Sequence, residues 1–327
     1  MSNIRKGWID AIKGIGIILV VIGHVFENQF AYDWIYSFHM PLFFFAAGVT
    51  FSEKPVFANI KRRIFTILVP YLFFGVLTAL YGCLVESRFR GTPSSIPDAL
   101  MGLVSGQYDT LYFNVPLWFL TCFFVVTVFY NLLCRTGKKY TAWAVSVIMV
   151  IIQILVPMPQ LPWGLDRAFI YMFFMALGHV FADSGADKRI EGLGIWQKVL
   201  IFAVMLGINF ALVYCGLIRG IFLYISAVPG IAACVALSMI SEKCRPICYL
   251  GSTTIVILCV HGPVYRAVTK VLAMVSGQET DVLRSSILWS LIISVIAIVI
   301  CVAGYEVLRR LLPEVTGNRR TKTTAKT

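Results

Sequence analysis

The segment IDAIKGIGIILVVIGHVF, residues 9–26, decides the class of this protein. It is apolar throughout except for Asp10, Lys13 and His24. A helix needs about 20 mainly apolar residues to span the hydrocarbon core of a bilayer. The run is too long for the apolar region of a signal peptide, and no small-residue cleavage site follows it. We therefore expect it to be retained as a first transmembrane helix.

The rest of the chain repeats this pattern. Of its 327 residues 59% are hydrophobic and only 13% charged, with a mean hydropathy of +0.83. Soluble domains carry roughly a quarter charged residues. The sequence therefore predicts an all-α polytopic membrane protein with about ten transmembrane helices. The predicted spans lie near residues 9–28, 34–52, 64–85, 116–134, 141–158, 167–183, 197–215, 219–240, 247–268 and 285–308.

The distribution of Lys and Arg between the apolar runs predicts the orientation. With both termini in the cytoplasm, about 20 of these side chains fall inside and about seven outside, and only an even number of spans gives this bias. We expect residues 1–312 to form one transmembrane domain and residues 313–327, which are basic and rich in Thr, to form a disordered cytoplasmic tail.

The net charge of +12 and the nine cysteines suggest neither nucleic-acid nor metal binding. The basic residues sit in short clusters, as cytoplasmic loops require. Most cysteines fall within predicted spans, where Cys acts as a small apolar residue. Cys244 and Cys248 lie close together, but no further His or Cys pair completes a metal site. The sequence also shows no internal repeat of the kind that many transporters carry.

The ionisable residues of the first span indicate function, because a charge near the bilayer centre costs about 2.5–3.5 kcal/mol. At 100° per residue, Lys13 and His24 point within about 20° of each other, with His24 roughly 16 Å further along the axis. Asp10 lies three residues before Lys13, where opposite charges can pair. The alternatives are interfacial anchoring for Asp10 and Lys13 and a satisfied core position for His24.

Three of the four histidines are predicted at one depth, near the outer surface, and only His179 lies on the cytoplasmic side. The outer group comprises His24, His39, Trp118, Arg167 and His261. Histidine supplies a base that titrates near neutral pH, which acyl transfer to a hydroxyl requires. The alternatives are that histidine is simply tolerated at helix ends and that Trp118 belongs to an interfacial aromatic belt.

Five strings in order resemble the signatures of the acyltransferase-3 family, transmembrane O-acyltransferases that modify bacterial surface sugars. They are RKGWIDAIKG (5–14) with VVIGH (20–24), FHMPLFFFAAG (38–48), KRR (61–63) with VPYL (69–72), PLWFL (116–120), and LGST (250–253) with VHGP (260–263). The resemblance covers about residues 5 to 310 and implies a fold of about ten helices. Many members carry Arg at the position of Lys13. A lysine at this position is similar to the fucose O-acetylase-like branch of the family. Lys cannot make the bidentate contacts of Arg.

The resemblance implies an enzyme of the bacterial cytoplasmic (inner) membrane that moves an acyl group from acetyl-CoA to a hydroxyl of a surface or exported glycan. It implies His24 as general base, with Lys13 and Asp10 setting the electrostatics of the donor channel. By the same resemblance Lys61, Arg62 and Arg63 are candidates to bind the cofactor phosphates, with Arg135, Lys138 and Lys139 as further candidates. The alternative is that these basic residues only set the topology. The resemblance assigns the acceptor or oxyanion to His39, Trp118, Arg167 and His261. No metal is expected.

Several alternatives stay open at the level of sequence. The acyl group can be succinyl rather than acetyl, and transfer can be direct or pass through an acyl-histidine. Exopolysaccharide, O-antigen, teichoic acid, peptidoglycan and a macrolide-like molecule are all possible acceptors. The competing function classes are a transporter or flippase for a small solute or lipid-linked sugar, and a non-catalytic sensor or binding module.

Overall fold

The computed structural model describes residues 7–90, 95–137 and 140–317, and every regular element in these ranges is helical. Within them, eight helices are long and apolar enough to cross a bilayer. They are α1 (Gly7–Val25), the run from α4 to η2 (Val56–Glu86), α8 (Trp118–Thr136), α10 (Leu165–Asp183), α12 (Ile195–Tyr214), α13 (Ile221–Ile240), α14 (Arg245–Ser276) and α16 (Ile287–Leu311). The predicted all-α membrane protein is confirmed.

The long run Val56–Glu86 is built from several segments, and short helices connect the spans. The run comprises α4 (Val56–Arg63), η1 (Ile64–Leu68), α5 (Val69–Tyr81) and η2 (Gly82–Glu86). The connecting elements are α6 (Ser87–Arg90), α7 (Ile96–Ser105), η3 (Tyr108–Thr110), η4 (Val115–Leu117), η5 (Pro162–Gly164), α11 (Ala186–Glu191), α15 (Thr280–Ser285) and η6 (Pro313–Thr316).

Two predicted spans differ from expectation. The span at 34–52 is not one helix, because the chain breaks at Ser37 and Phe38 into α2 (Gln29–Tyr36) and α3 (His39–Val49). The Ser37 hydroxyl donates to the carbonyl of Trp34, and Pro41 follows in the first turn of α3, where its missing N–H costs nothing. The span at 141–158 is α9 (Thr141–Leu155), 15 residues long and short for a full crossing. With α3 and α9, the eight long helices fill all ten predicted positions.

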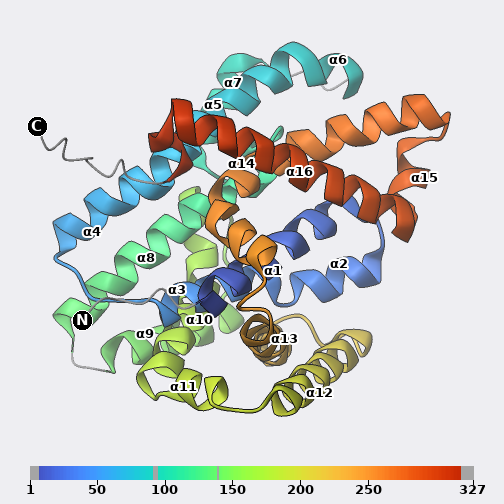
Figure 1. Ribbon diagram of the computed structural model, residues 1–327. Helices are drawn as coiled ribbons and strands as arrows, with labels where there is room; N and C mark the ends of the chain where they lie inside the picture. The colour runs from blue at the N-terminus through green and yellow to red at the C-terminus, as the bar shows by residue number, and fades with distance from the viewer. Residues whose placement is uncertain (1–6, 91–94, 138–139, 318–327) are drawn as a thin grey trace, which may run out of the picture.

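Helix α1 is the interior helix of the bundle and packs against α14, α13, α16 and α3 (Figure 1). Glycine makes this packing close, as is common between membrane helices. A Cβ at Gly251 of α14 would collide with the carbonyl oxygen of Asp10, and a Cβ at Gly14 would collide with that of Ile247. The α3–α10 crossing has the same character: Gly178 lies against the carbonyl of Phe45. These crossings fix the relative positions of the helices that carry the site.

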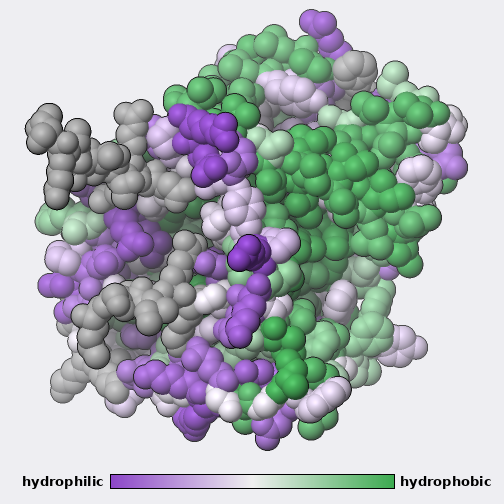
Figure 2. Space-filling model, in the orientation of Figure 1, coloured by the Kyte–Doolittle hydropathy of each residue, from purple (hydrophilic) through white to green (hydrophobic). Residues whose placement is uncertain are grey.

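The surface divides into apolar and hydrophilic regions. Figure 2 shows an apolar face over α16 and the nearby part of α14, and hydrophilic surface toward α4 and α11. On α16 the exposed side chains include Leu288, Val295 and Val299, which suits contact with lipid. At the end of the chain, η6 buries Val315 and Thr316. Residues 318–327, which make up most of the expected tail, lie outside the described residues.

Candidate functional site

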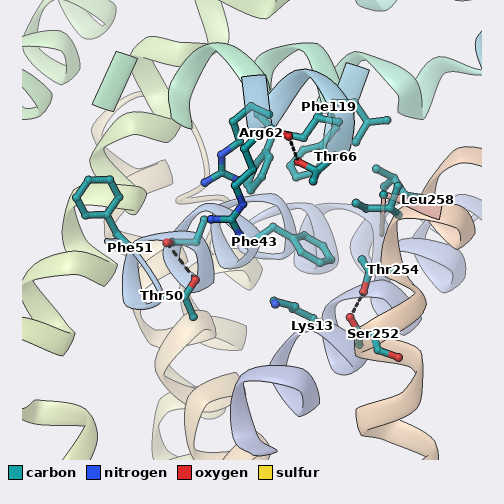
Figure 3. A pocket seen from close by; sticks show the side chains of 18 of the residues that line it. Lys13, Phe43, Thr50, Phe51, Arg62, Thr66, Phe119, Ser252, Thr254 and Leu258 are labelled. Atoms are coloured by element: carbon teal, nitrogen blue, oxygen red, sulfur yellow. Dashed lines mark hydrogen bonds between the residues drawn. The ribbon is translucent and has the colours of Figure 1, made fainter. Parts of the chain in front are cut away.

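A cavity of about 460 Å³ lies between α1, α3, α4, α8 and α14, and we call it the basic cavity. Four cationic side chains among the described residues line it: Lys13, Lys54, Arg62 and Arg63. Figure 3 shows Lys13 of α1 and Arg62 of α4 approaching the same space from different helices. Hydroxyls of Thr50, Ser52, Thr66, Ser252 and Thr254 add further polar groups. The lining suits an anionic ligand with several oxygen atoms.

A second cavity, of about 160 Å³, contains the predicted outer residues, and we call it the histidine cavity. Four of the five residues of that group line it: His24, His39, Trp118 and Arg167. The remaining polar lining is tyrosine, namely Tyr32, Tyr36, Tyr108 and Tyr171. The structure therefore brings together four residues that are far apart in the chain.

His24 is held from three directions at the end of α1. Its Nδ1 lies 2.6 Å from the Tyr36 hydroxyl, and its ring stacks on His261 with centroids 5.0 Å apart. Arg284 donates from Nε to the carbonyl of Val25 at 3.0 Å and from Nη2 to that of His24 at 3.1 Å. A cation on the last carbonyls of a helix caps its C-terminus. The imidazole that faces the cavity is therefore fixed in both position and orientation.

The other two histidines are each fixed in one orientation by the helix turn before them. His39 donates from Nδ1 to the carbonyl of Ile35 at 2.8 Å, and His261 donates from Nδ1 to that of Leu258 at 2.9 Å. A neutral imidazole that donates from Nδ1 keeps its lone pair on Nε2. His261 has 0% exposure and its Nε2 has no partner among the described residues. It lies behind His24 rather than in the described lining of the cavity.

Arg167 and Trp118 also line the histidine cavity. The guanidinium of Arg167 lies 4.3 Å from the ring centroid of Trp118 and 5.0 Å from that of Tyr108. A cation over two aromatic faces is stabilised by the quadrupoles of the rings. This packing fixes a positive charge and an aromatic surface beside the histidines, which suits a developing oxyanion or a sugar.

The two cavities adjoin, because Leu258 lines both. Each of four helical segments contributes to both cavities. The paired contributions are Lys13 and His24 from α1, Phe43 and His39 from α3, Phe119 and Trp118 at the start of α8, and Ser252 and Leu258 from α14. The strings noted in the sequence therefore contribute residues to two neighbouring cavities that share Leu258.

Several residues that were expected at the donor site line neither cavity. Of the described residues, Arg62 and Arg63 line the basic cavity, whereas Lys61 is exposed on α4 and does not. Asp10 is only 9% exposed, lies under Gly251 at the α1–α14 crossing and is in neither described lining. Arg135 pairs with Glu53 at 3.4 Å. Lys138 and Lys139 lie outside the described residues.

The sequence reasoning missed the tyrosines and Lys54. Tyr32 and Tyr36 are one helical turn apart on α2 and their rings stack at 3.9 Å. Their spacing, and the position of Tyr36 three residues before His39, was a signal that could have found them. Tyr108 begins η3, whose three residues are too few for a sequence period to predict the direction of a side chain.

The described part of the chain contains no group of three or more His, Cys, Asp or Glu side chains that could hold a metal ion. The basic cavity therefore offers an organic anion four cations, and the histidine cavity offers a base beside aromatic rings. A general base within reach of a hydroxyl, with cationic groups beside it, is the arrangement that acyl transfer uses.

Comparison with known proteins supports this reading. Residues 6–306 match the family model described as an acyltransferase domain, Acyl_transf_3. The chain is 24% identical over 355 residues to nodulation protein NolL of Mesorhizobium japonicum, an alignment covering 95% of this chain and 89% of the relative. It is 27% identical over 217 residues to nodulation protein NolL of Sinorhizobium fredii, covering 62% of this chain and 55% of the relative. No solved structure matches significantly. The protein belongs to the acyltransferase-3 family of membrane O-acyltransferases.

Proposed function

We propose that the protein transfers an acetyl or similar acyl group from acyl-CoA to a hydroxyl of a surface or exported glycan. The observation that carries this proposal is the junction of the two cavities at Leu258. One cavity is cationic and the other holds histidines and aromatic rings, so two substrates of different chemistry can meet between them. A transporter or a binding module would not need a base beside the junction.

The donor is acyl-CoA in the basic cavity. Its pyrophosphate pairs with Arg62, Arg63 and Lys54, and Lys13 binds closer to the thioester. Lys13 and His24 are eleven residues apart, about 16 Å along α1, which the extended arm of the cofactor spans. The basic residues of α4 belong to a predicted cytoplasmic cluster, so the donor enters from the cytoplasm of a bacterial cell.

The acceptor is a sugar hydroxyl in the histidine cavity. Rings of Trp118, Tyr32 and Tyr108 offer apolar faces for a sugar, and Arg167 offers N–H donors for its oxygens. The cavity lies at the end of α1 that is predicted to face outward, where lipid-linked and exported glycans are found. The cytoplasmic membrane of a bacterium is the setting that fits both substrates.

The chemistry follows from the orientation of His24. When His24 donates from Nδ1 to the Tyr36 oxygen, the lone pair is on Nε2, which takes the proton of the acceptor hydroxyl. The hydroxyl oxygen attacks the thioester carbonyl, and Arg167 with the indole N–H of Trp118 stabilises the oxyanion. The carbon–sulfur bond then breaks, and His24 returns the proton to the leaving thiolate of CoA. His39 orients the acceptor, and His261 supports the ring of His24.

The test compares cells that express the wild type, His24→Ala or the control Met274→Ala, which alters an exposed residue of α14. We expect O-acetyl groups on the surface glycan, measured by NMR, to disappear in His24→Ala and to persist in the control, with equal protein in the membrane. Full O-acetylation by His24→Ala would contradict the assigned base. Unchanged O-acylation after deletion of the gene would contradict the function.

A further inference from the structure

A third cavity, of about 250 Å³, lies beside the basic cavity and has a different lining. It is lined by Phe51, Glu53, Tyr130, Tyr140, Trp143 and Asp183, and we call it the aromatic cavity. It adjoins the basic cavity, because Phe51 and Ser52 line both. The reaction proposed above uses none of the side chains that line it.

The rim between the two cavities is the segment from Phe51 to Lys54, and its end is held by hydrogen bonds. Asn131 of α8 is buried and makes two hydrogen bonds to the backbone of Lys54: its Nδ2 donates to the carbonyl at 2.9 Å, and its Oδ1 accepts from the N–H at 3.0 Å. Lys54 lines the basic cavity, whereas its neighbour Glu53 lines the aromatic one. A ligand with one end among the cations therefore needs to pass only this short rim to reach the aromatic rings.

The aromatic cavity has the chemistry of a purine site. Tyr140 is 66% exposed and Trp143 is half-buried, so both rings are accessible at the cavity. Aromatic faces bind planar bases by stacking. The carboxylates of Glu53 and Asp183 accept hydrogen bonds, as an exocyclic amine and ribose hydroxyls require.

Two further contacts complete the site. The Tyr130 hydroxyl and Nδ1 of His179 are 2.9 Å apart, and His179 packs against Phe51 with ring centroids 4.9 Å apart, so these groups form an ordered floor. Arg135 lies at the edge, 3.4 Å from Glu53 and 40% exposed. A cation beside a purine site suits a phosphate carried on the ribose.

We infer that the aromatic cavity binds the adenosine 3′-phosphate end of the donor, with the purine against Tyr140 and Trp143 and the 3′-phosphate at Arg135. The basic cavity then holds the pyrophosphate and the arm that leads to the thioester. The inference rests on the proposed function in that it takes CoA as the donor. It divides the cofactor between two cavities that meet at Phe51 and Ser52.

The binding test uses the purified full chain in lipid nanodiscs and adenosine 3′,5′-bisphosphate as probe, with calorimetry as readout. We expect Tyr140→Ala and Trp143→Ala each to weaken binding about tenfold, the effect typical of losing one stacking partner. Trp196→Ala, at an exposed tryptophan of α12, is the matched control and binds as the wild type does. Tyr140 is mostly exposed, so its variant folds even where Trp143→Ala does not. Arg135→Ala weakens binding of the bisphosphate more than that of adenosine 5′-monophosphate.

The kinetic test separates this inference from the proposed function. We expect both aromatic variants to lower kcat/KM for acetyl-CoA about tenfold relative to kcat/KM for S-acetylpantetheine, which lacks the nucleotide. If the wild type uses acetyl-CoA but the variants show no such difference, the nucleoside site is wrong and the function stands. If the wild type uses no acyl-CoA, the proposed function is wrong. Binding of adenosine 3′,5′-bisphosphate then still tests whether the aromatic cavity is a nucleotide site. Wild-type protein that does not bind the bisphosphate, or variants that bind it equally well, overturn the inference.

Discussion

The imidazole rings of His24 and His261 stack with 13° between their planes and 5.0 Å between their centroids. They belong to α1 and α14, which cross closely because Gly251 lies against the backbone of Asp10. On its other side His24 meets the Tyr36 hydroxyl at 2.6 Å. The proposed base is thus held between a ring that sets its plane and a hydroxyl that sets which nitrogen carries the proton.

Replacing His261 tests the stacking role. We expect His261→Ala to lower kcat about tenfold or more, because a small shift of a reacting group costs up to a hundredfold in rate. His261→Phe keeps an aromatic ring and should retain more activity than the alanine variant. Equal losses in the two variants would show that His261 acts through its nitrogen atoms rather than through its ring. The measurement is acyl transfer at saturating donor in membranes with matched protein levels.

Replacing Tyr36 tests the orientation of His24. Tyr36→Phe removes the hydroxyl but keeps the ring that stacks on Tyr32 and meets His39 edge-on at 4.5 Å. We expect kcat to fall about tenfold to a hundredfold, with little change in KM for the donor, because the hydroxyl orients the base and does not bind CoA. Tyr32→Phe is the matched comparison and should cost less. A larger loss in Tyr32→Phe would contradict the assigned role.

The basic cluster on α4 allows a comparison of neighbours. Arg62→Ala should raise KM for acyl-CoA about tenfold or more, because a hydrogen bond to a charged group contributes about 1.5–3 kcal/mol. Lys61→Ala removes the same charge from an exposed position outside the described lining and should change KM much less. Steady-state kinetics at two salt concentrations provides the readout, and the difference should shrink at high salt. An equal rise in KM for the two variants would mean that the cluster attracts acyl-CoA by its total charge rather than through a direct contact of Arg62.

The α1–α14 crossing makes a prediction about stability. Gly251→Ala places a Cβ against the carbonyl oxygen of Asp10, so the helices must move apart. We expect a loss of about 1–3 kcal/mol, typical of overpacking. Gly304→Ala on α16 is the control, because no atom of the described residues lies within 4 Å of the added carbon. Thermal unfolding in detergent should show a lower transition temperature for Gly251→Ala alone.

The run lengths and charge positions predicted the membrane fold, since burial in lipid demands long apolar helices. Hydropathy alone did not predict the break between α2 and α3, which lies just before Pro41 in the first turn of α3. The period of one helix was enough to align Lys13 with His24. The burial of Asp10 could not be foreseen, because it depends on the partner helix α14.

The histidine cavity likewise combines features that the sequence predicts with contacts that depend on how the helices pack. Trp118 and Arg167 were expected at one depth, and the structure stacks them at 4.3 Å. Tyr36 was missed because a tyrosine near a helix end resembles an ordinary interfacial residue. Its role is visible only when the ends of α1 and α2 are seen to meet. The depth of a residue in the membrane can be deduced from the predicted topology, whereas the contacts between helices cannot.

The most direct test of the account is transfer of labelled acetyl from acetyl-CoA to an acceptor glycan by purified protein in liposomes. We predict that the wild type transfers label and releases CoA in equal amounts, and that His24→Ala does neither while still binding the donor. Transfer by His24→Ala at the wild-type rate would contradict the central claim that His24 is the base between the two cavities.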